Sequence, residues 1–252
     1  NSGITTVEFE ECILATGSRP GWIPGFPQPG ENIWDSTGAL AFETVPEKLL
    51  VIGGGYIGLE LGSVYATFGS SVTVAEFMPS ILPGADSDLV KPLLKKLRKN
   101  LHRIMVSTSV KAIENKDSGI HVTFDQNGVE SIESFDKALI SVGRKPNVEN
   151  IGLENAGIQL DDRGFISVNS KQQTNISNIY AIGDLTGDPM LAHKATAEGR
   201  IAAEIIAGEK SEFDPVAIPA VIYTDPEIAW AGLTETECKS IDIPYKKAEF
   251  PW

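Results

Sequence analysis

One segment limits the fold of this 252-residue chain more than any other: the apolar run Leu-Leu-Val-Ile at residues 49–52, together with the glycines directly after it. A short run of branched apolar residues is typical of a strand buried on both faces of a parallel sheet. The run leads directly into Gly53-Gly54-Gly55-Tyr56-Ile57-Gly58, and a helix is predicted over residues 56–68. Glycines at this spacing, between a strand and a helix, are typical of a turn that binds the pyrophosphate of a dinucleotide.

The glycines and the helix each have a physical task at such a turn. Gly53 permits the tight bend, Gly55 lets the backbone approach a pyrophosphate, and Gly58 lets the helix pack closely on the strand. The first turn of the helix adds free N–H groups and the positive end of the helix dipole, which favour phosphate. A purely structural glycine turn is the alternative, and the strand–turn–helix order favours the nucleotide.

The end of the next predicted strand, residues 72–76, carries the acidic residue that this motif requires. Glu76 follows Gly58 by 18 positions, close to where dinucleotide-binding folds carry a carboxylate that binds the adenosine ribose. That carboxylate would repel the 2′-phosphate of NADP, and Phe77 and Met78 bring no cation to bind one. The sequence therefore predicts NAD rather than NADP.

Strand-like and helix-like segments alternate along the rest of the chain, which predicts an α/β protein. Asp86 is the predicted N-cap of a helix reaching residue 100, with leucines at 89, 93, 94 and 97 on its apolar face. Further strands are predicted at residues 5–9, 12–15, 102–110, 138–142 and 178–182, from 218 onward, and in an exposed stretch ending in Phe250 and Trp252, with β-like runs across 112–139. A further helix is predicted over 192–207, ended by Gly208. A loop is predicted at 21–30, and turns at 126–128 and at Gly183-Asp184.

Composition excludes several classes of protein. Hydrophobic residues make up 42% and charged residues 22% of the chain, as in ordinary globular proteins. No apolar run reaches the roughly 18 to 20 residues needed to cross a bilayer. The formal net charge of −13 argues against nucleic-acid binding, which needs a surplus of Lys and Arg.

The two cysteines, Cys12 and Cys238, lie far apart in the sequence. They form neither a CxxC pair nor a zinc-ligand spacing, so no disulfide scaffold and no metal site are predicted, and both are expected to be buried thiols. Few thiols and no signal peptide favour a reducing, intracellular compartment. We expect a cytoplasmic protein, or one of the mitochondrial matrix in a eukaryote.

Several stretches together resemble one family, the flavoprotein pyridine nucleotide-disulfide oxidoreductases, and within it the dihydrolipoyl dehydrogenases. The glycine motif continues as Gly-Leu-Glu-Leu-Gly to Gly62. The other matching stretches are Ala-Thr-Gly-Ser-Arg-Pro at 15–20, Val-Gly-Arg-Lys-Pro-Asn at 142–147, Ile-Gly-Asp at 182–184, Met-Leu-Ala-His-Lys-Ala at 190–195 and Tyr-Thr-Asp-Pro-Glu at 223–227. The resemblance covers essentially the whole chain.

The resemblance implies binding residues for two cofactors, FAD and NAD. For NAD it adds neighbours to the glycine motif and Glu76, with Glu60 near the nicotinamide and a backbone contact from Val110; the added residues are Tyr56, Ile57, Glu60, Val110 and Gly143. For FAD it implies the ribityl-binding Asp184, a segment near the flavin, and a segment against the isoalloxazine ring; these residues are Thr16, Gly17, Ser18, Asp184, Met190, Leu191, Ala192 and His193.

Simpler roles remain open for four of the side chains in these motifs. Arg144 could cap a surface loop, and Asp184 could be an ordinary turn residue. Glu60 could serve only the dipole of its helix. His193 could be read as a catalytic base, whereas the resemblance implies that its segment supports the flavin by backbone contacts and packing.

Three features of the family do not occur in the sequence: an N-terminal GxGxxG, a CxxxxC redox pair and a C-terminal His-Glu dyad. The three histidines, at 102, 121 and 193, do not match the dyad, so no catalytic residue is predicted. We expect a central fragment with a Rossmann-like, three-layer NAD-binding domain at 31–147 inserted in parts of an FAD-binding domain at 1–30 and 148–217. The start of an α+β interface domain is expected at 218–252.

The resemblance implies a reaction for the complete protein, in which dihydrolipoamide reduces a disulfide and the electrons pass through FAD to NAD⁺. The partners it implies are a lipoyl domain of a 2-oxoacid dehydrogenase complex and a second copy in a homodimer. The open alternatives are a non-catalytic NAD-binding module and a fragment of a glutathione, trypanothione or mercuric reductase. An NAD-sensing regulator has no DNA-binding element or basic patch in its favour.

Overall fold

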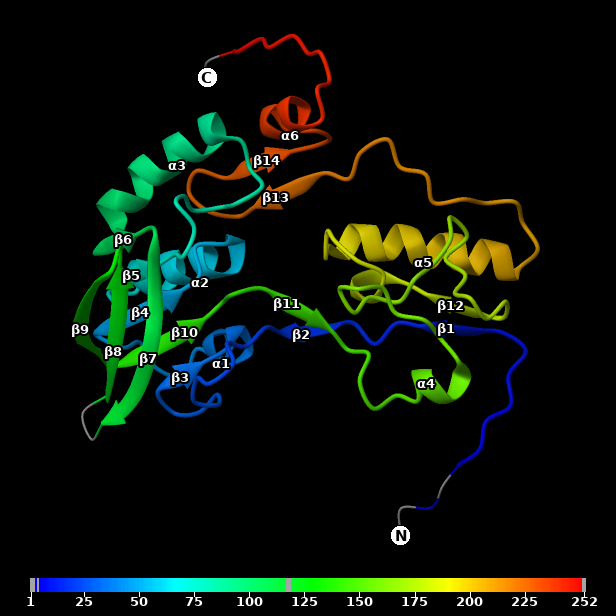
Figure 1. Cartoon of the computed structure of the whole chain (residues 1–252), viewed down its shortest axis with the longest axis horizontal. Helices are drawn as coiled ribbons and strands as arrows, with labels where there is room; N and C mark the ends of the chain where they lie inside the picture. The colour runs from blue at the N-terminus through cyan, green and yellow to red at the C-terminus, as the bar shows by residue number, and fades with distance from the viewer. Residues whose placement is uncertain (1–2, 4, 117–118, 251–252) are drawn as a thin grey trace. The chain divides into compact units, whose positions relative to one another are not determined.

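The computed structural model describes residues 3, 5–116 and 119–250, and the chain divides into two compact units (Figure 1). One unit contains Asn1–Arg19 and Arg144–Ile218, and the other contains Pro20–Gly143 and Pro219–Trp252. Among the described residues, no helix has both the length and the apolar composition needed to cross a membrane.

A five-stranded parallel sheet forms the centre of the second unit. Its strands, in spatial order, are β3 (Ile33–Trp34), β10 (Lys137–Ile140), β4 (Lys48–Ile52), β5 (Ser71–Ala75) and β6 (Arg103–Met105). Residues 49–51 are completely buried in β4, which confirms the predicted fully buried strand. The sheet belongs to an α/β fold, as the alternation of segments predicts.

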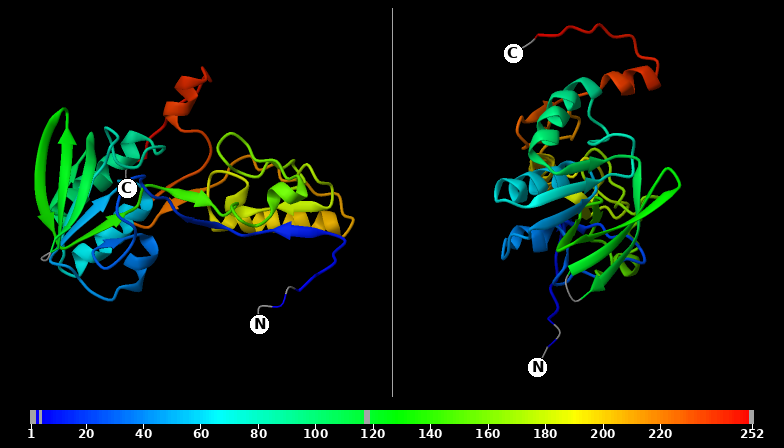
Figure 2. Two further views of the ribbon diagram at one scale, coloured as in Figure 1. Left: turned by 60° about the horizontal axis from the view of Figure 1, so that its bottom comes forward. Right: turned by 90° about the vertical axis from the view of Figure 1, so that its left-hand side faces the viewer.

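Successive residues of β4 point into two different cores. Leu49 and Val51 pack with the helices on one face, and Leu50 and Ile52 pack with an antiparallel sheet on the other. The helices are α1 (Ser36–Ala41), α2 (Tyr56–Thr67) and α3 (Ser87–Asn100); the antiparallel strands are β7 (Thr108–Lys116), β8 (Gly119–Gln126) and β9 (Val129–Phe135). The unit therefore has three layers, which Figure 2 shows end-on in its right-hand view.

The second unit also includes the last described part of the chain. Strands β13 (Ala220–Ile222) and β14 (Ile228–Trp230) pair in antiparallel fashion, and α6 (Glu235–Ser240) follows. Ile222 and Ile228 are buried in the helix-side core. Thr234 and Glu237 form a reciprocal capping box at the start of α6.

The first unit is built on short strands and one long helix. β1 (Cys12–Leu14) pairs in parallel with β12 (Ile179–Ala181), and β2 (Ser18–Pro20) pairs with β11 (Arg144–Pro146). The remaining elements are α4 (Leu153–Ala156), the 3₁₀ turn η1 (Gly183–Leu185) and α5 (Ala192–Ile206). Gly208, at φ 85°, follows α5 as predicted.

Several predicted elements are wrong in detail. Residues 5–9 form no strand, because no other described strand pairs with them and Val7 and Phe9 are exposed. The expected strand at 102–110 is two strands, β6 and β7, separated by a bend at which Ser107 has φ 51°. β10 ends at Ile140 and not at 142.

One prediction about α3 and one about the end of the chain also fail. Leu89 is exposed, because the buried face of α3 follows Val90, Leu93 and Leu97. Asp86 is the N-cap residue of α3, as predicted, but its carboxylate makes no capping hydrogen bond to that helix and accepts instead from N–H groups of α6. Residues 243–250 form no strand, and Trp252 lies outside the described residues. Cys238 is buried as expected, whereas Cys12 is only half-buried.

Candidate functional site

In the turn between β4 and α2, two of the three glycines of the GxGxxG motif leave no room for a side chain. A Cβ on Gly53, which has φ 109°, would lie 2.4 Å from the carbonyl oxygen of Ser141. A Cβ on Gly58 would lie 2.3 Å from the carbonyl oxygen of Gly53 and 2.9 Å from Val51 Cγ1. These distances agree with the tight bend and the close helix–strand packing assigned to these two glycines.

Gly55 differs from them in facing open space. It occupies the N-cap position of α2, and a Cβ built on it would have no heavy atom within 4 Å. An open backbone at a helix N-terminus fits a phosphate group, because the first N–H groups of the helix have no partner within the helix. Binding of a pyrophosphate at Gly55 remains a prediction that this cradle supports.

Glu76 lies directly after β5, where the sequence places it, and is only 7% exposed. Its Oε2 accepts a hydrogen bond from the N–H of Gly54 at 2.6 Å, and its Oε1 accepts one from the N–H of Met78 at 2.6 Å. Each carboxylate oxygen can accept a second hydrogen bond. Glu76 therefore braces the glycine turn and keeps acceptor capacity for a ribose hydroxyl.

A pocket of about 210 Å³ lies at the carboxyl ends of β4 and β5. Gly53, Glu76 and Val110, three of the predicted NAD residues, line it. Ligands of parallel α/β sheets bind at this edge. Because drug-sized ligands occupy pockets of roughly 300 to 1,000 Å³, this one fits a part of a dinucleotide, such as the ribose beside Glu76.

Two polar side chains that line this pocket, Thr108 and Ser109, are not among the residues predicted from the sequence. They immediately precede Val110, and this position next to a predicted NAD residue could have identified them. A single predicted strand over 102–110 does not show that their side chains line the pocket, because it omits the bend at Ser107 that sets their direction.

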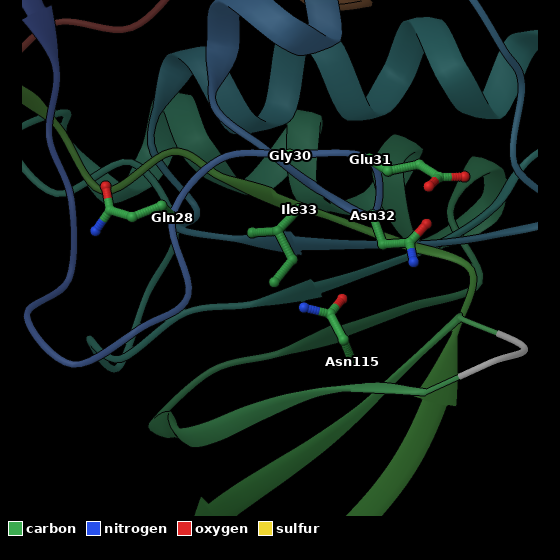
Figure 3. Close-up of a pocket in the computed structure, with 6 residues that line it drawn as sticks. All are labelled: Gln28, Gly30, Glu31, Asn32, Ile33 and Asn115. Carbon is green, nitrogen blue, oxygen red and sulfur yellow. The ribbon is translucent and has the colours of Figure 1, made fainter.

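A second pocket, of about 270 Å³, lies in the same unit at the amino end of β3 (Figure 3). Asn115 of β7 faces the loop residues that precede β3 across it, and Glu31 is the single ionisable residue among its six lining residues. It is the larger pocket, but it lies away from the carboxyl edge of the sheet and contains none of the predicted residues. We assign it no role in the site.

The other predicted NAD residues do not line the 210 Å³ pocket. Tyr56 and Ile57 form the first turn of α2, where Tyr56 is exposed and Ile57 half-buried. The carboxylate of Glu60 accepts a hydrogen bond from the N–H of Tyr223 at 2.8 Å, so it does more than serve the helix dipole. The carbonyl of Gly143 accepts one from the N–H of Gly21 at 2.8 Å.

In the first unit, the structure brings Ser18 and Asp184 together across 166 residues of sequence. The hydroxyl of Ser18 donates to Asp184 Oδ2 and accepts from Arg144 Nε at 2.7 Å. Arg144 also lies 3.9 Å from Asp184 Oδ2 in an ion pair. Arg144 therefore does not simply cap a surface loop, and Asp184 is more than an isolated turn residue.

Thr16 and Gly17 are held beside this cluster by Asn147. Thr16 Oγ1 donates to the Asn147 carbonyl at 2.7 Å, and the Asn147 N–H donates to the Gly17 carbonyl at 2.9 Å. Arg19 forms hydrogen bonds to both carboxylate oxygens of Glu149, and these lower the pKa of Glu149 to about 2. Of the predicted flavin residues at 16–18, Ser18 thus contacts Asp184 directly, and Asn147, which follows β11, holds Thr16 and Gly17.

The predicted flavin segment at 190–193 leads into α5, which packs against η1. Met190 and Leu191 are half-buried, whereas Ala192 and His193 are exposed. Leu191 occupies the N-cap position and, being apolar, offers no side-chain acceptor to the first N–H groups of α5. A polar cluster at Asp184 and an exposed helix start on the same unit suit a ligand with both hydroxyl and ring-edge acceptor groups, and FAD is such a ligand.

Comparison with known proteins shows the same relationship as the motifs. The family model described as pyridine nucleotide-disulphide oxidoreductase matches residues 2–199, and the model of that family's dimerisation domain matches residues 218–252. The dihydrolipoyl dehydrogenase of Haemophilus influenzae is 48% identical over 248 residues, which are 98% of this chain and 52% of that protein. The dihydrolipoyl dehydrogenase of Bacillus subtilis is 44% identical over 248 residues, 98% of this chain and 53% of that protein.

Solved structures agree with these matches. The HOCl-induced flavoprotein disulfide reductase of Escherichia coli aligns with a TM-score of 0.81 and 30% identity, over 92% of this chain and 53% of that one. The chain thus spans about half the length of the curated relatives it matches. The resemblance drawn from the motifs is confirmed, and the chain belongs to the pyridine nucleotide-disulphide oxidoreductase family.

Proposed function

We propose that this chain is the NAD-binding central part of a flavin-dependent disulfide oxidoreductase that reoxidises dihydrolipoamide with NAD⁺. The observation that carries the proposal is the glycine turn, in which Gly53 and Gly58 exclude any side chain and Gly55 is open. Relatives named dihydrolipoyl dehydrogenase, at 42–48% identity over nearly the whole chain, support this substrate.

When bound, FAD carries electrons between a redox disulfide and NAD⁺. The residues of the chain bind and orient the two cofactors. The N-terminus of α2 at Gly55 would bind the pyrophosphate of NAD, and Glu76 would accept hydrogen bonds from its ribose. Asp184, supported by Ser18 and Arg144, would accept hydrogen bonds from the ribityl hydroxyls of FAD, and residues at the start of α5 would hold the flavin.

We assign residues 31–147 to an NAD-binding domain, 1–30 and 148–217 to parts of an FAD-binding domain, and 218–252 to the start of an interface domain. The match of 218–252 to a dimerisation-domain model supports a homodimer. A lipoyl domain of a 2-oxoacid dehydrogenase complex is the proposed partner, and the cytoplasm the proposed location. Because its 252 residues contain no CxxxxC pair, we propose that the chain as given binds nucleotide without turning over dihydrolipoamide.

Other disulfide reductases and a non-catalytic module are the competing functions. A reductase that uses NADP would need a cation near the 2′-phosphate, whereas the pocket contains the carboxylate of Glu76. A non-catalytic NAD-binding module accounts for the glycine turn but leaves the Ser18–Asp184–Arg144 cluster without a role.

The first experiment is a visible absorption spectrum of the purified protein under anaerobic conditions, before and after addition of NADH. A flavin band that bleaches with NADH, and not with NADPH, supports the proposal. In a protein that also carries the CxxxxC pair, reduction of NAD⁺ by dihydrolipoamide, with no activity on glutathione disulfide, then identifies the substrate. A colourless protein that binds NADH supports the module alone, and a protein that binds neither FAD nor NADH contradicts both functions.

A further inference from the structure

Helix α5 contains a buried ion pair that the predicted site does not include. Lys194 and Glu198 lie one turn apart, with Lys194 Nζ 2.7 Å from Glu198 Oε1, and their side chains are only 6% and 3% exposed. Burying two charges carries a desolvation cost that their mutual attraction does not reliably offset. The pair therefore needs a reason to be kept other than the stability of the fold.

Helix stabilisation is a poor reason. Pairs at this spacing add only about 0.2 to 0.5 kcal/mol to a helix, and the favourable order has Glu before Lys. Here the order is reversed. The pair Arg200–Glu204 on the same helix has the same spacing and the same 2.7 Å distance, but its side chains are 79% and 23% exposed.

The remaining hydrogen bonds of the pair go to Gly183 of the turn η1 and to Thr186, the residue directly after it. Glu198 Oε2 accepts from the N–H of Gly183 at 2.6 Å. Lys194 Nζ donates to the carbonyl of Gly183 at 3.3 Å and to Thr186 Oγ1 at 3.1 Å. With Glu198, these acceptors use all three protons of the ammonium group.

Gly183 is thus held at both its N–H and its carbonyl, and it also contacts the helix directly. Its φ is 74°, and a Cβ built on it would lie 3.2 Å from the Cβ of Ala195. The next residue is Asp184, whose carboxylate is bonded by Ser18. Figure 1 shows α5 lying along β12, the strand that leads into this turn. The orientation of Asp184 is therefore coupled to Lys194 through the Gly183–Asp184 peptide unit, and to Glu198 through the Ile182–Gly183 unit before it.

We infer that Lys194 and Glu198 are positioning residues that hold the Gly183–Asp184 turn in the conformation that binds the ribityl chain of FAD. This inference rests on the proposed function, because it takes Asp184 as an FAD ligand. The two charged groups hold the two peptide units that flank the Cα of Gly183, and together they stabilise a single orientation of each. A neutral hydrogen bond would leave that orientation less strongly determined.

The test compares Glu198→Ala with the matched variant Glu204→Ala, in the full protein, with two measurements. The first is hydrogen exchange of the Gly183 amide, followed by NMR in the absence of FAD. The second is the FAD dissociation constant, from quenching of flavin fluorescence. We expect Glu198→Ala to accelerate exchange at Gly183 and to weaken FAD binding, each by about tenfold or more, since a hydrogen bond to a charged group contributes about 1.5 to 3 kcal/mol. Glu204→Ala should change neither by more than about twofold.

Two further variants keep the inference testable if Glu198→Ala does not fold. Glu198→Gln retains an oxygen that can accept from Gly183, so it should restore much of the protection at this amide. Thr186→Val removes one hydroxyl and keeps the ion pair, so it should give a smaller effect in the same direction. Unchanged exchange at Gly183 in both Glu198→Ala and Thr186→Val would overturn the inference, as would equal weakening of FAD binding by Glu204→Ala. If the unmodified protein bound no FAD, the proposed function would fail, and the role of the pair in FAD binding would fail with it. Hydrogen exchange at Gly183 would still decide whether the pair holds the turn.

Discussion

The carboxylate of Glu76 accepts a hydrogen bond from the N–H of Gly54 at 2.6 Å, across 22 residues of sequence. The residue predicted to select NAD is therefore also the residue that braces the glycine turn before α2. A change at Glu76 should alter cofactor choice and the stability of the turn together. This coupling makes the predicted NAD site accessible to stability measurements as well as to binding measurements.

Replacement of Glu76 by Ala should lower the free energy of unfolding by about 1 to 3 kcal/mol, because it leaves the buried N–H of Gly54 without its acceptor. It should also bring the affinities for NADH and NADPH closer together. Urea unfolding and fluorescence titration with both nucleotides would measure the two effects. Glu130→Ala, at an exposed position of β9, is the control. A variant as stable as the control would contradict the bracing role.

Alanine at Gly58 and at Gly55 should separate folding from binding. The Cβ of Gly58→Ala would lie 2.3 Å from a backbone oxygen, so overpacking should cost about 1 to 3 kcal/mol or more. Gly55→Ala meets no atom within 4 Å and should change stability by about 1 kcal/mol at most, while weakening NADH binding. Thermal unfolding and NADH titration of both variants are the measurements. Equal losses of stability would show that the glycine turn does not have the described geometry.

Glu149 should make a small contribution to acid stability. Hydrogen bonds from Arg19 lower its pKa from 4.5 to about 2 in the folded protein. A carboxyl whose pKa is lowered by folding stabilises the fold above its unfolded pKa, and this contribution is lost as pH falls through the folded pKa. The window is therefore pH 4.5 down to about 2, and the effect is modest because both side chains are exposed.

Carbon-13 NMR titration of the Glu149 carboxyl is the direct measurement of this pKa. In Arg19→Gln it should move up toward 4.5. Glu149→Gln should make the unfolding midpoint less dependent on pH across the same window. Asp162→Asn, which removes an exposed carboxylate from the same unit, controls for net charge. A pKa near 4.5 in the unmodified protein would contradict the pairing of Arg19 with Glu149.

Asp86→Ala should loosen α6. Its carboxylate accepts hydrogen bonds from the N–H of Glu235 at 2.9 Å and of Thr236 at 3.3 Å, which are the first donors of that helix. Loss of an acceptor at a helix start costs about 0.5 to 2 kcal/mol. Hydrogen exchange across residues 235–240 should become faster in this variant. Exchange that accelerates in α3 and not in α6 would contradict this role of the Asp86 carboxylate.

Patterns within a few residues predicted much of the fold and of the candidate site. The burial of residues 49–51 follows from their uninterrupted apolar character, and the reverse turn at 126–128 follows from Asn127 and Gly128, which have φ 55° and 81°. The strand–turn–helix at Gly53–Gly58 follows from glycine spacing alone. In each case the residues that determine the conformation are neighbours in the chain.

The features that can be read from the chain alone are thus local: the glycine turn, the buried strands, the helix faces and the identity of the motif residues. Which distant groups meet depends on tertiary packing. Packing brings the carboxylate of Asp86 into hydrogen-bond contact with α6, 149 residues away, and Ser18 into contact with Asp184, 166 residues away. It also brings Thr108 and Ser109 into the lining of the pocket, and it brings a buried Lys–Glu pair into hydrogen-bond contact with Gly183. Local propensity acts over one or two turns of chain, whereas these contacts depend on the path of the backbone between their partners, which only the packing of the whole unit specifies.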